Sequence, residues 1–273
     1  MATLPRDDIE LYYTDHGGDG RPVVLVHGWP LSGESWEDTV PALRDAGYRV
    51  VTYDRRGFGR SGWSDAGGYD YDLLTGDLAA LLDELDLSDV TLVGFSMGGG
   101  EVARYVGRHG ESRLRSVAFI GAIPPWLLKS DDNPDGGLDM ETARGMQTSF
   151  RADREAFLDG FLTTFFSVDG ELVVTEEQRQ RALELAAQAN GDAAAACIVL
   201  WTSRFTDDVA RLSVPTLIVH GDSDAIVPFE VSGKRLHEQV AGSELVVVEG
   251  GPHGLLASHT DLVNRTLLEF LAR

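Results

Sequence analysis

The chain has 273 residues, a formal net charge of −21 and a pI near 4.5. So acidic a surface argues against binding to nucleic acid, because the phosphates would be repelled. No apolar run approaches the roughly 20 residues that a membrane-spanning helix requires. The single cysteine, Cys197, excludes an internal disulfide, and the N-terminal stretch is polar and acidic. The sequence therefore predicts one large domain in a reducing, cytoplasmic setting.

The positive side chains are unusual, because only Lys129 and Lys234 are lysines and the rest are arginines. An acid-rich, lysine-poor surface is typical of proteins that work in concentrated salt, where ions screen the repulsion between like charges. A base composition that favours Asp and Arg codons would produce the same bias. Both explanations stay open at this stage.

The first predicted elements are strands at residues 9–14 and 23–26, separated by a glycine-rich turn, and we expect them to form a hairpin. A third strand at residues 49–53 leads into a loop in which residues 57–62 match G-x-G-x-x-G, the dinucleotide fingerprint. That pattern should open a helix. Here it runs into Trp63-Ser64-Asp65-Ala66-Gly67-Gly68, so we predict a loop and no dinucleotide site.

Strands and helices alternate along most of the chain. Leucines at helical spacing predict a core-facing helix over residues 73–85. Further strands and helices are predicted at residues 90–93, 101–109, 116–120, 215–220, 229–240, 244–248 and 262–271. Between residues 122 and 205 only helical spacing appears, which predicts a helical cap. We therefore expect an α/β fold with a mostly parallel sheet and helices on both faces, in which residues 1–121 and 206–273 form the core and residues 122–205 the cap.

One glycine-rich turn carries the strongest chemical signal. Gly94-Phe95-Ser96-Met97-Gly98 matches G-x-S-x-G between a predicted strand and a predicted helix. So sharp a turn forces its middle residue into strained backbone angles, and the flanking glycines avoid a collision. The hydroxyl of Ser96 then points outward as a nucleophile. The N–H groups at the start of the following helix lie beside it, where they would stabilise an oxyanion.

The second oxyanion donor is expected from an earlier loop, His27-Gly28-Trp29-Pro30, which also follows a strand. The candidate donors are the backbone N–H groups of Trp29 and Met97. Because Pro30 disfavours helical angles at Trp29, it fixes how that peptide faces the site. We expect His27 to be a packing residue at the strand end rather than a catalytic one.

Ser96 needs a base, and the base needs a carboxylate that orients it. Among the seven histidines, only His253 lies in a loop flanked by glycine and proline after a late strand, so it is the predicted base. The preceding loop contains both Asp222 and Asp224. Spacing alone does not separate these two candidates, and turn chemistry favours Asp222, directly after Gly221.

Several motifs together resemble the cofactor-free haloperoxidase and aryl esterase branch of the α/β-hydrolase family, over nearly the whole chain. They are His27-Gly28-Trp29-Pro30, Asp54-Arg55-Arg56-Gly57, Gly94-Phe95-Ser96-Met97-Gly98-Gly99 with Glu101-Val102-Ala103-Arg104-Tyr105, His220-Gly221-Asp222-Ser223-Asp224-Ala225-Ile226-Val227-Pro228 and Pro252-His253-Gly254. The chain departs from the family pattern at Phe95, where histidine is more usual, and in residues 147–190, which match weakly.

This resemblance implies an α/β-hydrolase fold, Asp224 as the acid and oxyanion donation by Trp29 and Met97. It implies an apolar acyl pocket built from Trp29, Phe157, Phe161, Ile226, Val227 and Phe229. Family members hydrolyse small esters, and many transfer the acyl group to hydrogen peroxide, giving a peracid that oxidises halide without bound metal or haem. The Trp29-Pro30 pair is typical of members with this perhydrolase activity. The resemblance also implies no cofactor, and assembly as dimers or trimers.

Other functions of the same fold stay open to different degrees. Dehalogenases and epoxide hydrolases use an aspartate nucleophile and are disfavoured, because the turn carries Ser96. A hydroxynitrile lyase or a carbon–carbon hydrolase could use the same triad. A small-molecule receptor would keep the pocket without turnover. A burst of p-nitrophenol from p-nitrophenyl acetate would separate an enzyme from such a receptor.

Overall fold

The computed structural model describes residues 2–64 and 68–273, and its centre is an eight-stranded sheet in the order β1-β2-β4-β3-β5-β6-β9-β10. The strands are β1 (Ala2–Arg6), β2 (Ile9–Asp15), β3 (Pro22–Val26), β4 (Arg49–Tyr53), β5 (Val90–Phe95), β6 (Leu114–Ile120), β9 (Thr216–Gly221) and β10 (Glu244–Val248). All pairs from β4 to β10 are parallel, whereas β2 is antiparallel to both of its neighbours. The predicted mostly parallel sheet is confirmed.

The predicted hairpin between residues 9–14 and 23–26 is wrong. β2 pairs with β1 on one side and with β4 on the other, while β3 lies between β4 and β5. Burial explains the difference. The last four residues of β3 are all buried, as a central parallel strand requires, whereas β2 begins with an alternation of buried and exposed residues. A local turn signal carries no information about this choice of partner.

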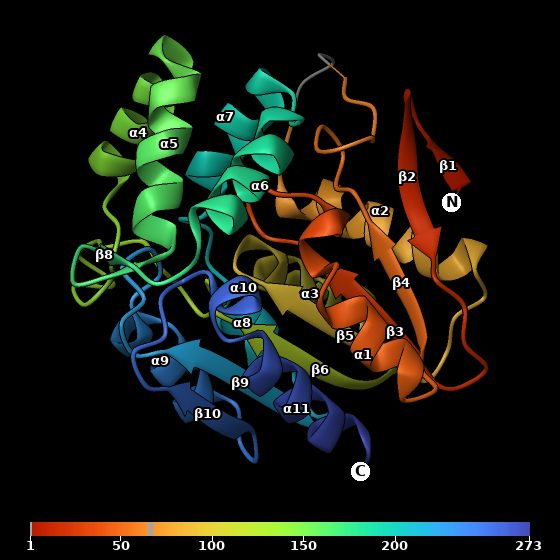
Figure 1. Ribbon diagram of the computed structural model, residues 1–273. Coiled ribbons are helices and arrows are strands. Elements are labelled where there is room, and N and C mark those ends of the chain that lie inside the picture. The colour runs from red at the N-terminus through yellow and green to blue at the C-terminus, as the bar shows by residue number, and fades with distance from the viewer. Residues whose placement is uncertain (1, 65–67) are drawn as a thin grey trace.

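Helices cover both faces of the sheet. In Figure 1, α1 (Thr39–Asp45) and α11 (Thr260–Leu271) lie in front of the strands, and α2 (Tyr71–Glu84) and α3 (Met97–His109) lie behind them. The leucine-rich helix predicted over residues 73–85 is α2, so that prediction is confirmed.

The helix predicted over residues 229–240 is interrupted. A short 3₁₀ turn (Phe229–Val231) precedes α9 (Gly233–Gln239), and Ser232 between them has φ −130° and ψ −88°. The Ser232 hydroxyl donates to the carbonyl of Ala122. A Cβ at Gly233 would lie 2.6 Å from Nδ1 of His220. The start of α9 therefore packs so closely on β9 that position 233 has no room for a side chain.

The glycine-rich loop of residues 57–62 opens no helix within the described chain before α2. The N–H of Gly57 donates to the carbonyl of Gly62 at 2.8 Å, which closes the loop on itself. The loop prediction therefore agrees with the structure for residues 57–64 and 68, while residues 65–67 lie outside the described chain.

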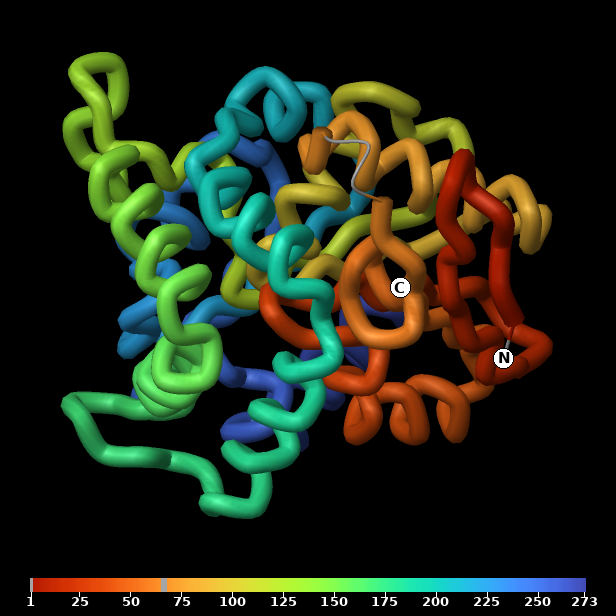
Figure 2. The backbone as a smooth tube through the Cα atoms, turned by 90° about the horizontal axis from the view of Figure 1, so that it is seen from above, coloured from red at the N-terminus to blue at the C-terminus, as the bar shows by residue number. Residues whose placement is uncertain are grey.

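The segment between β6 and β9 is mainly helical, as predicted. It contains α4 (Met140–Ala152), α5 (Arg154–Phe165), α6 (Glu176–Ala187), α7 (Gly191–Leu200) and α8 (Thr206–Val209). A two-stranded hairpin, β7 (Ser167–Val168) with β8 (Glu171–Leu172), was not predicted. Figure 1 shows α4 to α7 above the sheet, and in Figure 2, the view from above, the same segments cover the left and centre of the molecule. The division of the chain into core and cap at residues 122 and 205 stays a prediction.

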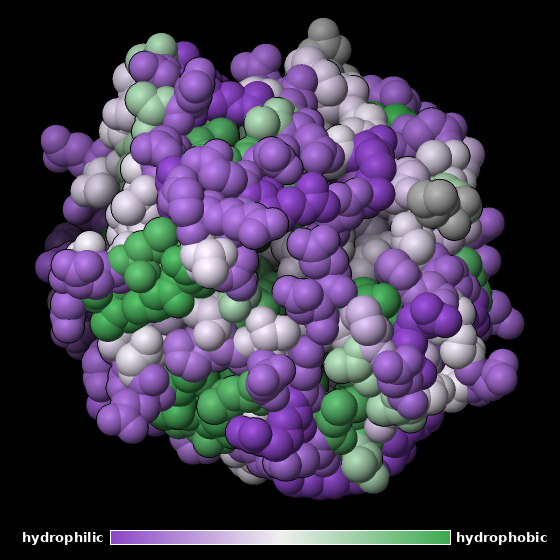
Figure 3. All heavy atoms as spheres, in the orientation of Figure 1, coloured by the Kyte–Doolittle hydropathy of each residue, from purple (hydrophilic) through white to green (hydrophobic). Residues whose placement is uncertain are grey.

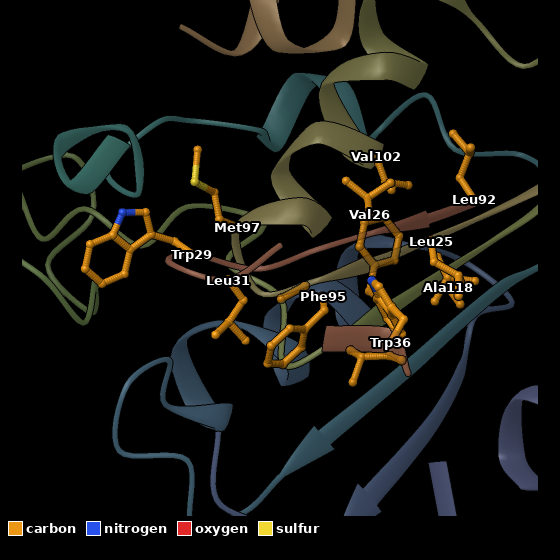
Figure 4. Close-up of a cluster of buried hydrophobic side chains, with 14 of the residues drawn as sticks. Leu25, Val26, Trp29, Leu31, Trp36, Leu92, Phe95, Met97, Val102 and Ala118 are labelled. Atoms are coloured by element: carbon orange, nitrogen blue, oxygen red, sulfur yellow. The ribbon is translucent and has the colours of Figure 1, made fainter. Parts of the chain in front are cut away.

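The core is continuous from the sheet into α3. The buried cluster in Figure 4 joins Leu25 and Val26 of β3, Leu92 and Phe95 of β5, and Val102 of α3, all at most 1% exposed. Burial of these side chains holds the ends of β3 and β5 and the start of α3 in one rigid unit. No helix within residues 2–64 and 68–273 has the length and apolar content needed to span a bilayer.

The face shown in Figure 3 is mostly hydrophilic, with scattered apolar patches, and the chain carries a net charge of −21. If this acidity is an adaptation to salt, screening of the repulsion will stabilise the folded state. We expect the melting temperature to rise by at least about 3 °C between low and molar NaCl, which is about 1 kcal/mol at this chain length. Scanning calorimetry checks this. A melting temperature that stays level or falls would favour the codon-composition explanation.

Candidate active site

Ser96 lies in the strained turn that its glycine-rich surroundings predict. It caps the N-terminus of α3 with φ +53° and ψ −118°, a backbone conformation that few non-glycine residues adopt. A Cβ at Gly98 would lie 2.4 Å from the carbonyl oxygen of Val26, and one at Gly94 would lie 2.6 Å from that of Gly98. Neither position has room for a side chain, so both glycines are required for α3 to begin immediately after β5.

Three side chains from distant loops meet in one hydrogen-bonded chain. The Ser96 hydroxyl lies 2.8 Å from Nε2 of His253, and Nδ1 of His253 lies 2.7 Å from Oδ2 of Asp224. His253 is fully buried, and Ser96 and Asp224 are 6% and 5% exposed. Ser96 follows β5, Asp224 follows β9 and His253 follows β10, so the carboxyl ends of three parallel strands bring these groups together.

Asp224, and not Asp222, is the carboxylate that contacts His253. Its Oδ1 accepts hydrogen bonds from the N–H groups of Ile226 (2.9 Å) and Val227 (2.8 Å), which leaves Oδ2 facing the imidazole. Asp222 is exposed, and its Oδ1 accepts from the N–H of Gly250 at 2.8 Å. Asp222 therefore links the loop after β9 to the loop after β10 without contacting His253.

The surroundings of Asp224 keep it ionised. Burial alone would raise the pKa of Asp224, but the attraction of His253, the hydrogen bond from His253 and the imidazole of His220 3.4 Å away outweigh burial and lower the pKa below the ordinary carboxyl value. Because the pKa is lower in the folded state, this carboxylate stabilises the fold above its ordinary pKa, and that contribution is lost as the pH falls through the folded value. At neutral pH a negative charge faces His253.

The two expected oxyanion donors belong to backbone segments that adjoin Ser96. Met97 is the first residue of α3, where an N–H has no acceptor within the helix. The loop that carries Trp29 passes directly beside the serine, since a Cβ at Gly28 would lie 3.1 Å from the Cβ of Ser96. The indole of Trp29 is buried, and its Nε1 donates to the carbonyl of Ala194 at 3.0 Å, so the cap holds this loop from above.

A cavity of about 190 Å³ opens onto Ser96. Its wall is mainly apolar and comes from the loops around the serine and from the cap. The lining residues are Trp29, Ser96, Ile123, Leu127, Gly137, Leu138, Met146, Phe161, Trp201, Ala225, Ile226 and Val227. Four of the predicted pocket residues, Trp29, Phe161, Ile226 and Val227, are among them.

Phe157 and Phe229 do not line this cavity. Phe157 packs against the indole of Trp29 (ring centroids 6.3 Å apart), and Phe229 packs against the imidazole of His220 (5.8 Å). Other wall residues were not predicted, among them Met146 of α4 and Trp201 directly after α7. A helical pattern in the cap predicts a helix but does not tell which of its faces meets the serine.

A second, larger cavity of about 480 Å³ lies between α6 and the loop after His253, and Ser96 does not line it. Phe95 and Phe165 form part of its wall and also contact the ring of His253, with centroids 5.3 and 4.8 Å away. Phe95 therefore packs against the imidazole of His253. Within the described residues, no group of three or more His, Cys, Asp or Glu side chains is placed to hold a metal ion.

A family model described as alpha/beta hydrolase fold matches residues 21–260. The chain belongs to the α/β-hydrolase family. Among its relatives, this α/β-hydrolase is 43% identical to a non-heme chloroperoxidase from Kitasatospora aureofaciens over 272 residues, which cover 97% of each chain. It is 35% identical to a bifunctional esterase/perhydrolase from Acinetobacter calcoaceticus over 276 residues, again 97% of each chain.

The fold of this α/β-hydrolase also matches solved structures. A bromoperoxidase from Bacillus anthracis superposes with a TM-score of 0.93 at 51% identity, covering 97% of this chain and 96% of that one. An esterase from Exiguobacterium antarcticum superposes with a TM-score of 0.91 at 32% identity, covering 98% and 97%. The family resemblance predicted from the motifs is thereby confirmed.

Proposed function

We propose that this protein is a serine esterase that hydrolyses small carboxylic esters through an acyl-enzyme and also transfers the acyl group to hydrogen peroxide. The observation that carries the proposal is the hydrogen-bonded chain from Ser96 through His253 to Asp224, which opens onto an apolar cavity. The names of the relatives support both halves of the activity, since they include esterases and a perhydrolase.

In the first half-reaction His253 accepts the proton of Ser96 as the serine oxygen attacks the ester carbonyl. Asp224 stabilises the imidazolium, and the N–H groups of Trp29 and Met97 donate to the tetrahedral oxyanion. When the intermediate collapses, the C–O bond to the alcohol breaks and His253 protonates the departing oxygen. The acyl group remains esterified to Ser96.

In the second half-reaction His253 accepts a proton from water or hydrogen peroxide, whose oxygen attacks the acyl carbon. The serine oxygen leaves and takes the proton back from His253. Water releases a carboxylic acid, and peroxide releases a peracid. A peracid can then oxidise a halide ion to hypohalous acid while it is itself reduced to the carboxylic acid, which connects the esterase chemistry to the names of the haloperoxidase relatives.

The proposal is tested on p-nitrophenyl esters of increasing acyl length, with hydrolysis and perhydrolysis measured in parallel. We expect a burst of p-nitrophenol, labelling of Ser96 by an organophosphate and faster release of the acyl group when peroxide is present. Ligand binding without turnover would instead identify a receptor. Turnover that is unaffected by peroxide would leave an esterase without the second activity.

The small cavity predicts a preference for short acyl groups, and Met146 in its wall offers a test. Shortening Met146 to alanine should raise kcat/KM for the hexanoate ester, relative to the acetate ester, by about 10-fold. This factor corresponds to the burial of about two more methylenes of the acyl chain, at roughly 0.8 kcal/mol each. The ratio is measured from initial rates. Phe229→Leu, outside the cavity, is the control and should leave the ratio unchanged. An unchanged ratio in Met146→Ala would show that the acyl chain lies elsewhere.

The location and the assembly of the protein follow from the sequence analysis and stay predictions. The single cysteine, Cys197, is buried and free, as expected of a protein in the cytoplasm. The family resemblance implies dimers or trimers. Size-exclusion chromatography with light scattering measures the number of subunits.

A further inference from the structure

A buried ion pair lies beneath the oxyanion loop. Arg55 follows β4 and is 1% exposed, and Glu101 lies in α3 and is fully buried. Nε of Arg55 donates to Oε1 of Glu101 at 2.5 Å, and the hydroxyl of Tyr53 donates to Oε2 at 2.7 Å. Both carboxylate oxygens are thus engaged. The proposed mechanism assigns no role to any of these three residues.

The same arginine also holds the strand end that leads into the oxyanion loop. Nη2 of Arg55 donates to the carbonyl of His27 at 2.6 Å, and the backbone N–H of Arg55 donates to Nε2 of His27 at 2.9 Å. Because Nε2 accepts, the proton of the neutral ring is on Nδ1. That nitrogen lies 2.8 Å from the carbonyl oxygen of Gly28 and donates to it. Burial and the nearby Arg55 charge lower the pKa of His27 well below its ordinary value, which keeps the ring neutral.

These contacts set the direction of the peptide between Gly28 and Trp29. In a planar trans peptide the C=O and the following N–H point in opposite directions. The carbonyl of Gly28 is held by His27 and by the N–H of Leu31 at 3.1 Å. The N–H of Trp29 must therefore point away from the His27 ring. Glu101 belongs to the same helix as Met97, whose N–H is the other donor.

We propose that the Arg55–Glu101 pair, acting through His27, is a positioning device that fixes the two oxyanion donors relative to each other. The inference rests on the proposed function. Stability alone gives little reason for such a pair, because the desolvation of two buried charges offsets most of their attraction, and apolar residues of similar volume often stabilise a fold as well. A guanidinium, however, can donate to a carboxylate and to a backbone carbonyl at the same time.

The neighbouring residue provides a matched control. Arg56 is 5% exposed and donates to both carboxylate oxygens of Asp77, at 2.6 and 2.7 Å. It makes no hydrogen bond with His27 or α3 among the described residues. Arg55→Lys and Arg56→Lys therefore both disturb a buried arginine that is paired with a carboxylate, but only the first releases the oxyanion loop.

The experiment compares three variants with the wild type on p-nitrophenyl acetate. We expect Arg55→Lys to lower kcat by about 10- to 100-fold with KM changed less than about twofold, since loss of one donor costs at most about 10²- to 10³-fold. The affinity for an alkaneboronic acid, which forms a tetrahedral adduct on the serine, should fall by a similar factor. Tyr53→Phe, which frees one oxygen of Glu101, should show a smaller loss of the same kind. Arg56→Lys should leave kcat and boronate affinity unchanged.

Melting temperatures and circular dichroism establish the folded fraction of each variant. If Arg55→Lys does not fold, Tyr53→Phe decides the question. Folded variants with wild-type kcat and boronate affinity would overturn the inference alone, and so would an equal loss in Arg56→Lys. A wild type that shows no burst and no labelling of Ser96 would overturn the proposed function, and the inference with it.

Discussion

Replacing Ser96 with alanine is expected to lower kcat for p-nitrophenyl acetate by about 10⁴- to 10⁶-fold, because serine, histidine and aspartate act as one unit. The hydroxyl lies 2.8 Å from Nε2 of His253, and its loss removes the atom to which the proposed mechanism attaches the acyl group. The variant should still bind the ester, since the apolar cavity is unchanged. Steady-state rates, the burst amplitude and organophosphate labelling measure the effect.

Ser130→Ala is a suitable control for this substitution. The Ser130 hydroxyl is buried and has no hydrogen-bond partner among the described residues, and it lies outside the cavity at Ser96. We expect its kcat to stay within about twofold of the wild type. If Ser96→Ala kept more than about a hundredth of the wild-type rate, a different nucleophile would have to carry the reaction.

The second large effect separates the two aspartates of one loop. Asp224→Asn should lower kcat by about 10³- to 10⁴-fold, because the amide no longer stabilises the imidazolium and permits the wrong tautomer of His253. Asp222→Asn removes a charge at an exposed position, and an amide oxygen can still accept from the N–H of Gly250. Its kcat should stay within about threefold of the wild type. Both rates are measured on the same ester with matched folded fractions.

The opposite pattern of rates would contradict the assignment of Asp224. A crippled Asp222→Asn with a nearly normal Asp224→Asn would make Asp222 the working acid and would require the loop after β9 to rearrange during turnover. The thermal stabilities of the two variants help to interpret the rates. Asp224 is buried and its Oδ2 accepts from Nδ1 of His253, so an amide NH₂ in place of that oxygen would set two donors against each other and should also lower the melting temperature. The replacement of the exposed Asp222 should change the melting temperature less.

Features that depend on neighbours in the chain were predictable from the sequence. The turn around Ser96 needs glycine at positions 94 and 98, because a Cβ there would collide with backbone atoms. Five consecutive residues are enough to recognise this requirement. The helical spacing of α2 and the alternation of strands and helices are equally local. His253 could be predicted as the partner of Ser96 from its loop alone, because the loops that follow parallel strands all lie at the same edge of the sheet.

The choice between Asp222 and Asp224 was not local. Both follow β9 in the same loop, and turn propensity favoured the wrong one as a partner for His253. The path of the loop decides, because the N–H groups of Ile226 and Val227 hold one oxygen of Asp224 and leave the other facing the imidazole. The family resemblance, rather than spacing, had indicated Asp224.

The sequence by itself determined the choice of Ser96 and His253, whose side chains lie 2.8 Å apart, and the mostly parallel character of the sheet, since these follow from short-range sterics and from the periodicity of burial. The tertiary structure alone decided the partners of β2 and β3, the cavity wall at Met146 and Trp201, and the pairing of Arg55 with Glu101. Each of these joins residues far apart in the chain. Such contacts depend on how whole elements pack, and no local pattern of residues encodes that packing.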